Sequence, residues 1–322
     1  MTLPAIGISL GDPGGVGPEI VLKALSERAS LPEARYIVFG GRSIVEEAAE
    51  ALGLRPGFIT WEKGELPSGP GLFFRDVGGS PVEFVKGKAS AGNGEASFLF
   101  FKAAVEMARV SLLKAVVTSP ISKTSWRLAG LSWRGHTEYL ESLFPGAIMT
   151  FWSGRLKVAL LSHHIPLAEA LGRVRKDVLL DFFRALHRSL AGVRSGVEEL
   201  LVAGLNPHGG EDGLLGGEET TEIRPAIEAA AKEGIPVSGP FPPDTVFLKA
   251  LDHPEKMVVA MSHDQGLIAF KLVAFETGVN ATLGMPFIRT SPDHGTAYDI
   301  AGKGAADPRS LIAAIRMAVE LS

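Results

Sequence analysis

The sequence predicts an α/β protein with a largely parallel sheet, helices on both faces of that sheet, and more than one domain. Apolar runs of strand length alternate with helical patterns along the chain, which is typical of βαβ architecture. The chain has 322 residues, and a single core rarely extends beyond about 250 residues. The first expected strand is followed by a glycine-rich turn, GDPGGVG, and strand, turn and helix in this order are typical of anion-binding sites.

The first part of the chain alternates short apolar runs with helical patterns. Strands are expected at residues 6–10, 36–39, 72–74 and 115–118. Helices are expected from Pro18 onward and over residues 43–52 and 95–109. Residues 53–71 are expected to form a loop, and residues 130–135 a crossover into a second domain.

The second part repeats this alternation. Strands are expected at residues 147–151, 157–161, 199–203 and 257–260. Helices are expected at residues 177–190, between Pro225 and Gly234, and at 310–321. Glycine, proline and polar residues mix in the segment after residue 260, which predicts a loop shaped around a polar ligand. That loop would carry Lys271, Asn280, Arg289 and Asp293.

Composition excludes several classes of protein. The net charge is −4 without any block of like charge, which argues against a nucleic-acid partner. Cysteine is absent, so any metal site must use His, Asp or Glu. No apolar run approaches the ~18 residues of a membrane span, and the N-terminus lacks the pattern of a signal peptide. We therefore expect a cytoplasmic protein that binds no membrane.

Three histidines share one setting. His164, His208 and His263 each follow an expected buried strand and lie near Pro or Gly. The ends of such strands meet at one edge of a sheet, so three imidazoles there form a candidate divalent-metal site. No short ligand spacing such as HExxH supports it, and histidines that hydrogen-bond loop carbonyls remain the alternative. His163 adjoins His164, and only one of these two can readily face the same cleft.

Other residues suit an anionic substrate and a dinucleotide. His136 and Thr137 stand at an expected helix start, where backbone N–H groups favour an anion, although an ordinary cap explains the pattern equally well. Lys271 and Arg289 could bind phosphate or carboxylate. The segment SPDHGTAYDIAGKGAADP combines glycines with polar side chains that adenine and ribose could contact. Its candidate cofactor residues are His294, Gly295, Asp299 and Gly302.

Seven motifs give the chain a family resemblance. They are GDPGGVGPEI, TSPISK, GHTEYL, LNPHGGEDGLLGGEE, PPDTVF, SHDQGLIAFK and GVNATLGMPFIRTSPDHGTAYDIAGKG. In this order they resemble the motifs of the 4-hydroxythreonine-4-phosphate dehydrogenase family of pyridoxal phosphate (vitamin B6) biosynthesis. The resemblance spans nearly the whole chain. It implies an isocitrate/isopropylmalate dehydrogenase-like fold, with two α/β domains, mostly parallel sheets and a cleft between the domains.

The resemblance also implies different roles for the two domains. Residues 1–130 with 280–322 would form the cofactor-binding domain, and residues 131–279 the metal, substrate and dimerisation domain. The family forms homodimers whose active sites are shared between subunits, with the residue matching His263 supplied by the other subunit. The implied metal ligands are His164, His208 and His263. The implied substrate contacts are His136, Thr137, Lys271, Asn280 and Arg289.

The implied reaction is the oxidation of 4-phosphohydroxy-L-threonine at its 3-hydroxyl, followed by decarboxylation to 3-amino-2-oxopropyl phosphate. NAD or NADP and a divalent metal (Zn, Co, Mn, Mg or Ni) would serve as cofactors. The catalytic base is unassigned, with Asp244, Asp264 and Lys271 as candidates. The alternatives are a dehydrogenase of 4-phospho-threonate or 4-phospho-erythronate, a metal-dependent phosphohydrolase and a catalytically silent ligand-binding protein.

Overall fold

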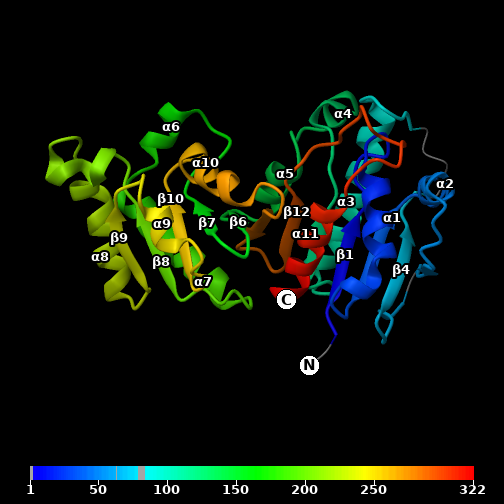
Figure 1. Ribbon diagram of the computed structural model, residues 1–322, viewed down its shortest axis with the longest axis horizontal. Coiled ribbons are helices and arrows are strands. Elements are labelled where there is room, and N and C mark those ends of the chain that lie inside the picture. Colours follow the sequence, from blue (N-terminus) through cyan, green and yellow to red (C-terminus); the bar gives the residue numbers. More distant parts are fainter. Residues whose placement is uncertain (1–2, 63, 79–83) are drawn as a thin grey trace. The chain divides into compact units, whose positions relative to one another are not determined.

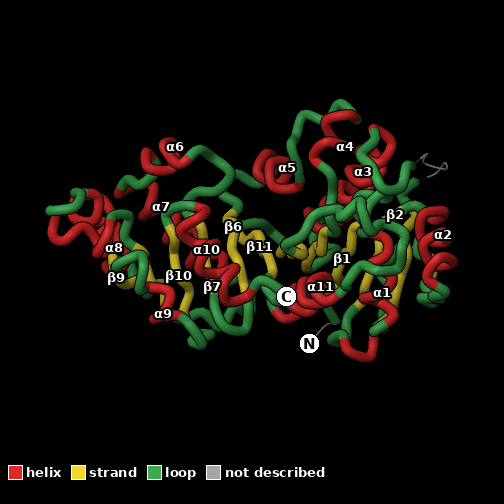
Figure 2. The backbone as a smooth tube through the Cα atoms, turned by 45° about the horizontal axis from the view of Figure 1, so that its top comes forward, coloured by secondary structure: helices red, strands yellow, loops and turns green. Residues whose placement is uncertain are grey.

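The computed structural model describes residues 3–62, 64–78 and 84–322, and the chain forms two compact units (Figures 1 and 2). Unit 1 comprises Met1–Pro145 and Pro286–Ser322, and unit 2 comprises Gly146–Met285. The sequence analysis placed the domain boundaries after residues 130 and 279, whereas the two units divide after residues 145 and 285. The assignment of a cofactor role to one domain and a metal role to the other stays a proposal. Helices flank mostly parallel strands in both units, which confirms the predicted α/β class.

Unit 1 is built on a sheet with the strand order β3-β4-β2-β1-β5-β12, and its neighbouring strands are parallel. The strands are β1 (Ala5–Ser9), β2 (Arg35–Gly40), β3 (Ile59–Thr60), β4 (Gly71–Asp76), β5 (Ala115–Thr118) and β12 (Ile288–Pro292). The helices are α1 (Gly17–Ser26), η1 (Arg28–Ser30), α2 (Arg42–Leu52), α3 (Ala91–Arg109), α4 (Lys123–Leu128), α5 (His136–Leu143) and α11 (Arg309–Glu320).

Helices α3 and α11 cover opposite faces of this sheet (Figure 1). Successive residues of a strand point to opposite faces. On β12, the Thr290 hydroxyl donates a hydrogen bond of 2.9 Å to the Ala314 carbonyl of α11. The neighbouring Arg289 reaches the imidazole of His136, which contacts Phe101 of α3. The two faces of β12 therefore have different roles: one packs on a helix and the other holds a polar cluster.

Unit 2 has the strand order β11-β6-β7-β10-β8-β9. Strands β7, β10, β8 and β9 are mutually parallel, whereas β6 is antiparallel to both β7 and β11. The strands are β6 (Ile148–Trp152), β7 (Lys157–Leu160), β8 (Glu199–Ala203), β9 (Val237–Phe241), β10 (Lys256–Ala260) and β11 (Val279–Leu283). The helices are α6 (Leu167–Gly172), α7 (Lys176–Ala191), η2 (Pro207–Gly213), η3 (Glu219–Ile223), α8 (Arg224–Lys232), α9 (Val246–Ala250) and α10 (His263–Ala274).

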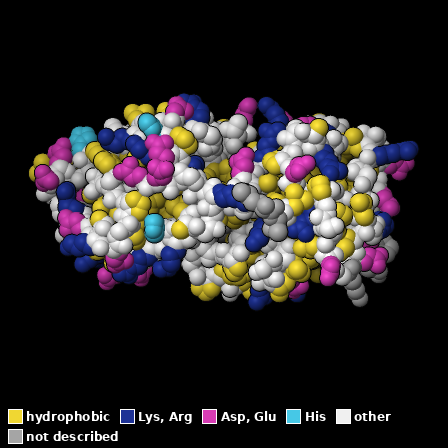
Figure 3. All heavy atoms as spheres, turned by 90° about the horizontal axis from the view of Figure 1, so that it is seen from below, with side chains coloured by type: hydrophobic (Ala, Val, Ile, Leu, Met, Phe, Trp, Pro, Cys, Tyr) yellow, Lys and Arg dark blue, Asp and Glu magenta, His cyan; other side chains and the backbone are white. Residues whose placement is uncertain are grey.

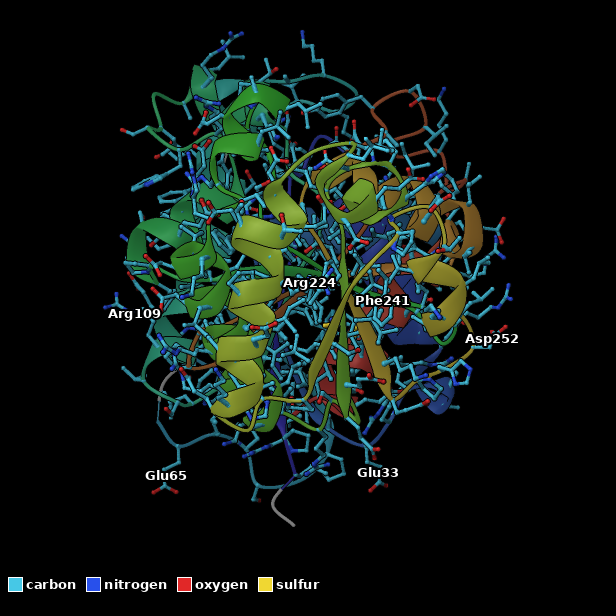
Figure 4. The ribbon with its side chains drawn as sticks, turned by 90° about the vertical axis from the view of Figure 1, so that its left-hand side faces the viewer. Glu33, Glu65, Arg109, Arg224, Phe241 and Asp252 are labelled. Carbon is cyan, nitrogen blue, oxygen red and sulfur yellow. The ribbon has the colours of Figure 1, made fainter. Side chains whose placement is uncertain are left out.

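One face of the unit 2 sheet packs against α9 and α10, and its core includes Val158, Val258, Val246 and Phe270. Figure 4 shows α8, which begins at the labelled Arg224, on one side of β9 and α9 on the other. Among the described residues, no helix has both the length and the apolar character needed to cross a membrane. On the face drawn in Figure 3, Lys and Arg side chains are interspersed with Asp and Glu.

The structure corrects two expectations. The segment after residue 260 is largely regular, because Lys271 lies on α10, Asn280 on β11 and Arg289 on β12. The glycines that suggested a loop allow close packing instead. A Cβ atom on Gly266 of α10 would lie 2.7 Å from the Leu160 side chain of β7. The residue is glycine because the helix lies too close to the sheet for a side chain. The expected loop at 53–71 also contains the short strand β3.

Candidate active site

A buried polar cluster in unit 1 joins His136 to Arg289. His136 is the first residue of α5, as the sequence predicted, and Arg289 lies on β12. Their side chains are 7% and 6% exposed. Arg289 Nε donates a hydrogen bond of 2.9 Å to the Thr118 hydroxyl at the end of β5, and its Nη2 lies 3.3 Å from His136 Nδ1. The structure therefore brings together two of the predicted substrate-binding residues.

The hydrogen-bonding partner of His136 determines which tautomer of the imidazole is present. A guanidinium can only donate hydrogen bonds, so Nδ1 must accept and the proton of the neutral ring sits on Nε2. Among the described residues, Nε2 is buried without a hydrogen-bond partner. Buried polar groups are nearly always paired in folded proteins. An acceptor from a ligand, such as an oxygen of an anionic substrate, would satisfy this N–H group.

Burial shapes the ionisation of this cluster. It lowers the pKa of His136 well below 6.5, and the nearby charge of Arg289 lowers it further. Burial also lowers the pKa of Arg289 to about 10. At neutral pH the imidazole is therefore neutral and the guanidinium charged. The cluster offers one cation and one neutral N–H donor, which suits a phosphate or carboxylate.

Asp12 organises a second network in unit 1, which composition and spacing did not reveal. Its carboxylate is fully buried and accepts hydrogen bonds from the hydroxyls of Tyr298 (2.8 Å) and Ser125 (3.0 Å) and from the Gly14 N–H (2.8 Å). Burial raises the pKa of Asp12. Three segments far apart in the sequence are held together at this carboxylate: the first glycine-rich turn, the start of α4 and the candidate cofactor segment.

The candidate cofactor segment runs over the start of α1. His294, Gly295, Asp299 and Gly302 are exposed, and the Val16 N–H donates to the Thr296 carbonyl at 2.9 Å. Gly15 lies so close to Thr296 that an added Cβ would be 2.7 Å from its carbonyl oxygen. The glycine-rich turn and the segment predicted to bind a dinucleotide therefore lie in contact.

In unit 2, the residues after β7 and β10 form a pocket. Its empty space is about 840 Å³, counting the part open to solvent, and His163, His164 and His263 are among its lining residues. The rings of His164 and His263 of one chain lie 5.7 Å apart, and those of His163 and His164 lie 5.3 Å apart. Parallel pairing of β7 with β10 brings their carboxyl ends together. The predicted convergence thus holds for two of the three histidines proposed as metal ligands.

Two of the three histidines proposed as metal ligands have a carboxylate within hydrogen-bonding distance of their ring atom Nδ1. His263 Nδ1 lies 2.7 Å from Asp264 Oδ1, and His208 Nδ1 lies 2.7 Å from Glu211 Oε1. The hydrogen bond to Glu211 raises the pKa of His208. When Nδ1 carries the ring proton, Nε2 keeps its lone pair for a metal, and a carboxylate on Nδ1 is the usual companion of a metal-binding histidine.

His208 does not join the other two histidines within one chain. It is not among the lining residues of their pocket, and it follows β8 in a turn that has left-handed backbone over His208–Asp212. Among the described residues, no three His, Asp or Glu side chains form a group able to hold a metal ion. His164 and His208 have φ of 50° and 55°, a strained conformation that occurs preferentially at functional sites.

The remaining predicted site residues occupy three elements and one loop. Thr137 is half-buried in the first turn of α5, and Asn280 is half-buried on β11. Lys271 is half-buried on α10, and Asp244 is exposed just before α9.

Comparison with known proteins decides the family. The model of the pyridoxal phosphate biosynthetic protein PdxA family matches residues 33–318. The chain is also 42% identical over 325 residues to the 4-hydroxythreonine-4-phosphate dehydrogenase of Desulforapulum autotrophicum, covering 98% of this chain and 94% of that protein. The chain belongs to the PdxA family. The resemblance drawn from the seven motifs is thereby confirmed.

Other relatives of this PdxA family member differ in their named substrate. The D-threonate 4-phosphate dehydrogenase of Salmonella typhimurium is 38% identical over 332 residues and covers 100% of both chains. The crystal structure of 4-hydroxythreonine-4-phosphate dehydrogenase from Klebsiella pneumoniae has a TM-score of 0.84 with this chain at 34% identity, covering 98% of each. The dehydrogenase class is shared by these relatives, and the named substrate is not.

Proposed function

We propose that the protein is a metal-dependent NAD(P) dehydrogenase that oxidises 4-phosphohydroxy-L-threonine at its 3-hydroxyl and releases 3-amino-2-oxopropyl phosphate. The observation that carries this proposal is the pair of imidazoles, His164 and His263, in a pocket at the carboxyl ends of parallel strands. Membership of the PdxA family supports a dehydrogenase over the phosphohydrolase and the silent binding protein.

The donor set suits a divalent cation in part. His164 and His263 offer two imidazoles in one pocket, and the carboxylates beside His263 and His208 favour tautomers with a free Nε2. A third imidazole has to come from His208, which one chain does not bring to that pocket. Imidazole ligands with open positions suit Zn, Co, Mn or Ni better than Mg.

The cofactors and the side chains of the protein would carry out different parts of the reaction. A bound divalent cation would polarise the substrate hydroxyl and stabilise enolate charge, and a bound nicotinamide would accept the hydride from C3. The hydroxyl proton passes to a base, for which Lys271 and Asp244 remain candidates. Asp264 is assigned to orient His263, because its carboxylate contacts Nδ1. The resulting 3-keto acid loses its carboxyl group as carbon dioxide, and a proton returns to C2.

The buried cluster is assigned to the anionic part of the substrate. Arg289 supplies the positive charge, and His136 supplies an Nε2–H group that has no hydrogen-bond partner in the described part of the chain. Thr137 follows in the first turn of α5, where backbone N–H groups also favour an anion. Lys271 and Asn280 are assigned to the remaining polar groups of the substrate. The dinucleotide is assigned to His294, Gly295, Asp299 and Gly302, in the segment held by the Asp12 network.

A homodimer would complete the site. Helix α10, which begins at His263, has an exposed apolar stripe formed by Ile268 and Leu272 and continued by Phe275 just past its end, with 65%, 83% and 74% exposure. Side chains this apolar at helical spacing commonly mark a protein interface. A second subunit packed on this stripe would lie beside the histidine pocket. It could then supply the imidazole that one chain lacks.

The experiment is metal reconstitution of the chelated protein under anaerobic conditions, followed by NADH production from 4-phosphohydroxy-L-threonine. D-threonate 4-phosphate is the second candidate, because a relative with that name covers the whole chain. Parallel assays of both substrates and of 4-phospho-erythronate decide between them. Phosphate release without any requirement for NAD would contradict the proposed function.

A further inference from the structure

The turn that carries His208 follows β8 and lies mostly at the surface of unit 2. The His208 side chain is 66% exposed, and within residues 207–215, all of which the structure describes, Gly210 alone is buried. The backbone is left-handed from His208 to Asp212, a conformation that costs free energy for residues other than glycine. Burial of apolar side chains does not hold this turn in place, so polar contacts have to do so.

Glu219 of η3 supplies such contacts from a buried position at the base of the turn. The residue is 1% exposed. Its Oε1 accepts hydrogen bonds of 2.7 Å from the backbone N–H groups of both Leu205 and Asn206, which follow β8. Its Oε2 accepts a third, of 2.9 Å, from the side-chain amide of Asn206. One carboxylate therefore fixes the two residues through which the chain enters the His208 turn.

The far side of the turn also packs closely on this carboxylate. An added Cβ on Gly210 would lie 2.7 Å from Glu219 Oε2. An added Cβ on Gly216 would lie 2.3 Å from the side-chain nitrogen of Asn206, which bonds the same oxygen. Glu219 is thus in contact with the chain both before and after His208. A change in its hydrogen bonding would move the backbone on both sides of the imidazole.

We propose that Glu219 is a positioning residue for His208, and that its carboxylate sets the place of the imidazole and thereby the affinity for the metal. The inference rests on the proposed function, because it takes His208 as a metal ligand. It goes further by naming a residue that acts on the metal through the backbone, whereas Glu211 contacts the imidazole ring itself. Replacing a residue that orients a metal ligand commonly lowers the affinity for the metal by about 10–100-fold.

The substitution Glu219→Gln keeps the size of the side chain and disturbs one bond. Two backbone donors converge on Oε1, so the oxygen of the new amide takes that position. Its NH₂ group then faces the side-chain amide of Asn206, and a donor meets a donor. Asn206 cannot relieve this by turning its amide over, because its oxygen would then face the Glu218 carboxylate. We expect the turn to shift while unit 2 stays folded, since the two backbone bonds are kept.

The test measures the dissociation constant of Co(II) alone for the full chain, after chelation, by calorimetry. The constant should rise by about tenfold or more in Glu219→Gln, and the constant for NAD should not change, because NAD is assigned to unit 1. The absorption spectrum of bound Co(II) should also change, since it reports ligand geometry, whereas a loss of stability alone would leave it as it is. Glu222→Gln is the matched control and should leave Co(II) binding unchanged, because Glu222 of η3 accepts from the Lys176 N–H of α7.

A second pair of variants tests the same contact without altering Glu219. Gly210→Ala and Gly213→Ala each place a Cβ where the backbone is left-handed, with φ of 81° and 98°. The new Cβ meets Glu219 Oε2 at position 210, but at position 213 it has no atom of the described residues within 4 Å. Gly210→Ala should therefore weaken Co(II) binding by about tenfold more than Gly213→Ala does.

The outcomes separate this inference from the proposed function, with His208→Ala as the reference for a lost ligand. If His208→Ala weakens Co(II) binding, an unchanged constant in a folded Glu219→Gln would overturn the positioning role and leave the dehydrogenase intact. Equal effects of the two glycine variants would overturn it as well, and this result does not depend on whether Glu219→Gln folds. Failure of the wild type to bind Co(II), or equal binding by the wild type and His208→Ala, would overturn the proposed metal site and the inference with it.

Discussion

Replacement of Arg289 by methionine separates the stability of unit 1 from substrate binding. Methionine has similar length and no charge, so it fills much of the space without offering any hydrogen bond. The side chain is 6% exposed and contacts Thr118 and His136. If Arg289 binds the anionic part of the substrate, Arg289→Met should weaken substrate binding strongly while the protein stays folded.

The effect on stability is the difference between two opposing terms. Burial lowers the pKa of Arg289 from 12.5 to about 10, and this shift corresponds to about 3 kcal/mol against the charged form. At pH 7 the group is charged in both the folded and the unfolded chain, so this cost lowers the free energy of unfolding. Methionine removes it but leaves the partners at Thr118 and His136 without a donor, at about 1 kcal/mol or more each. Because these terms oppose each other, the free energy of unfolding should change much less than the free energy of substrate binding does.

The loss of substrate binding in Arg289→Met is not offset by an opposing term. Hydrogen bonds from a charged donor contribute about 1.5–3 kcal/mol each, and a guanidinium can make two of them to a phosphate or carboxylate. The KM for the phosphorylated substrate should therefore rise by about a hundredfold or more. The KM for NAD should change little, because the cofactor is assigned to the segment at residues 294–302.

The assay follows NADH absorbance at varied substrate and varied NAD, alongside urea unfolding of the same preparations. Arg316→Met is the matched control, because Arg316 is an exposed arginine of unit 1 that bonds the Ser30 carbonyl. Equal increases of both KM values, or an unchanged KM for the substrate, would refute the role assigned to Arg289. Loss of folding would refute the stability calculation.

Three further predictions follow from the site. If the two subunits share the metal ligands, the variants His208→Ala and His263→Ala should each be inactive alone but regain activity when they are unfolded and refolded together. About a quarter of the wild-type activity should return, because half of the randomly formed dimers are mixed and each mixed dimer has one intact site of two. No recovery would argue against shared sites. Burial lowers the pKa of His136 in the folded chain, so the unfolded chain takes up a proton at a higher pH than the folded chain does. The wild type should therefore lose more stability than His136→Gln as the pH falls from 7 to 5, and parallel curves in urea titrations would contradict this. Tyr298→Phe removes one of the donors to Asp12 and should lower the free energy of unfolding by about 2 kcal/mol. The loss should exceed that of Ser322→Ala, which removes a hydrogen bond from the half-buried Ser322 hydroxyl to the neutral Ala318 carbonyl.

The sequence alone predicted the class of fold and most of its elements. Short apolar runs of Val, Leu and Ala such as those at residues 115–118 and 199–203 were correctly assigned as strands, because a buried parallel strand is apolar on both faces. The motifs identified the family, and the positions of His164 and His263 after such strands predicted that they converge. These inferences succeed because they depend on local pattern and on the common direction of parallel strands.

The loop expected after residue 260 shows where local pattern fails. Strand β12 has the sequence IRTSP, with polar side chains where a buried strand usually has apolar ones. Those side chains are satisfied by groups from elsewhere in the chain: Arg289 bonds Thr118, and Thr290 bonds the Ala314 carbonyl. A periodicity analysis cannot detect such partners, because it registers only the polarity of each residue.

Only the tertiary structure decided which distant residues share a site. Asp12 and Tyr298 are separated by 286 positions, and His136 and Arg289 by 153. Their contacts depend on the order of strands in the sheet, which places β12 beside β5. Strand order results from the packing of the whole unit and leaves no trace in local composition. The same limit applies to His208, which follows a buried strand as predicted yet lies outside the pocket of the other two histidines, because the left-handed turn after β8 sets its position.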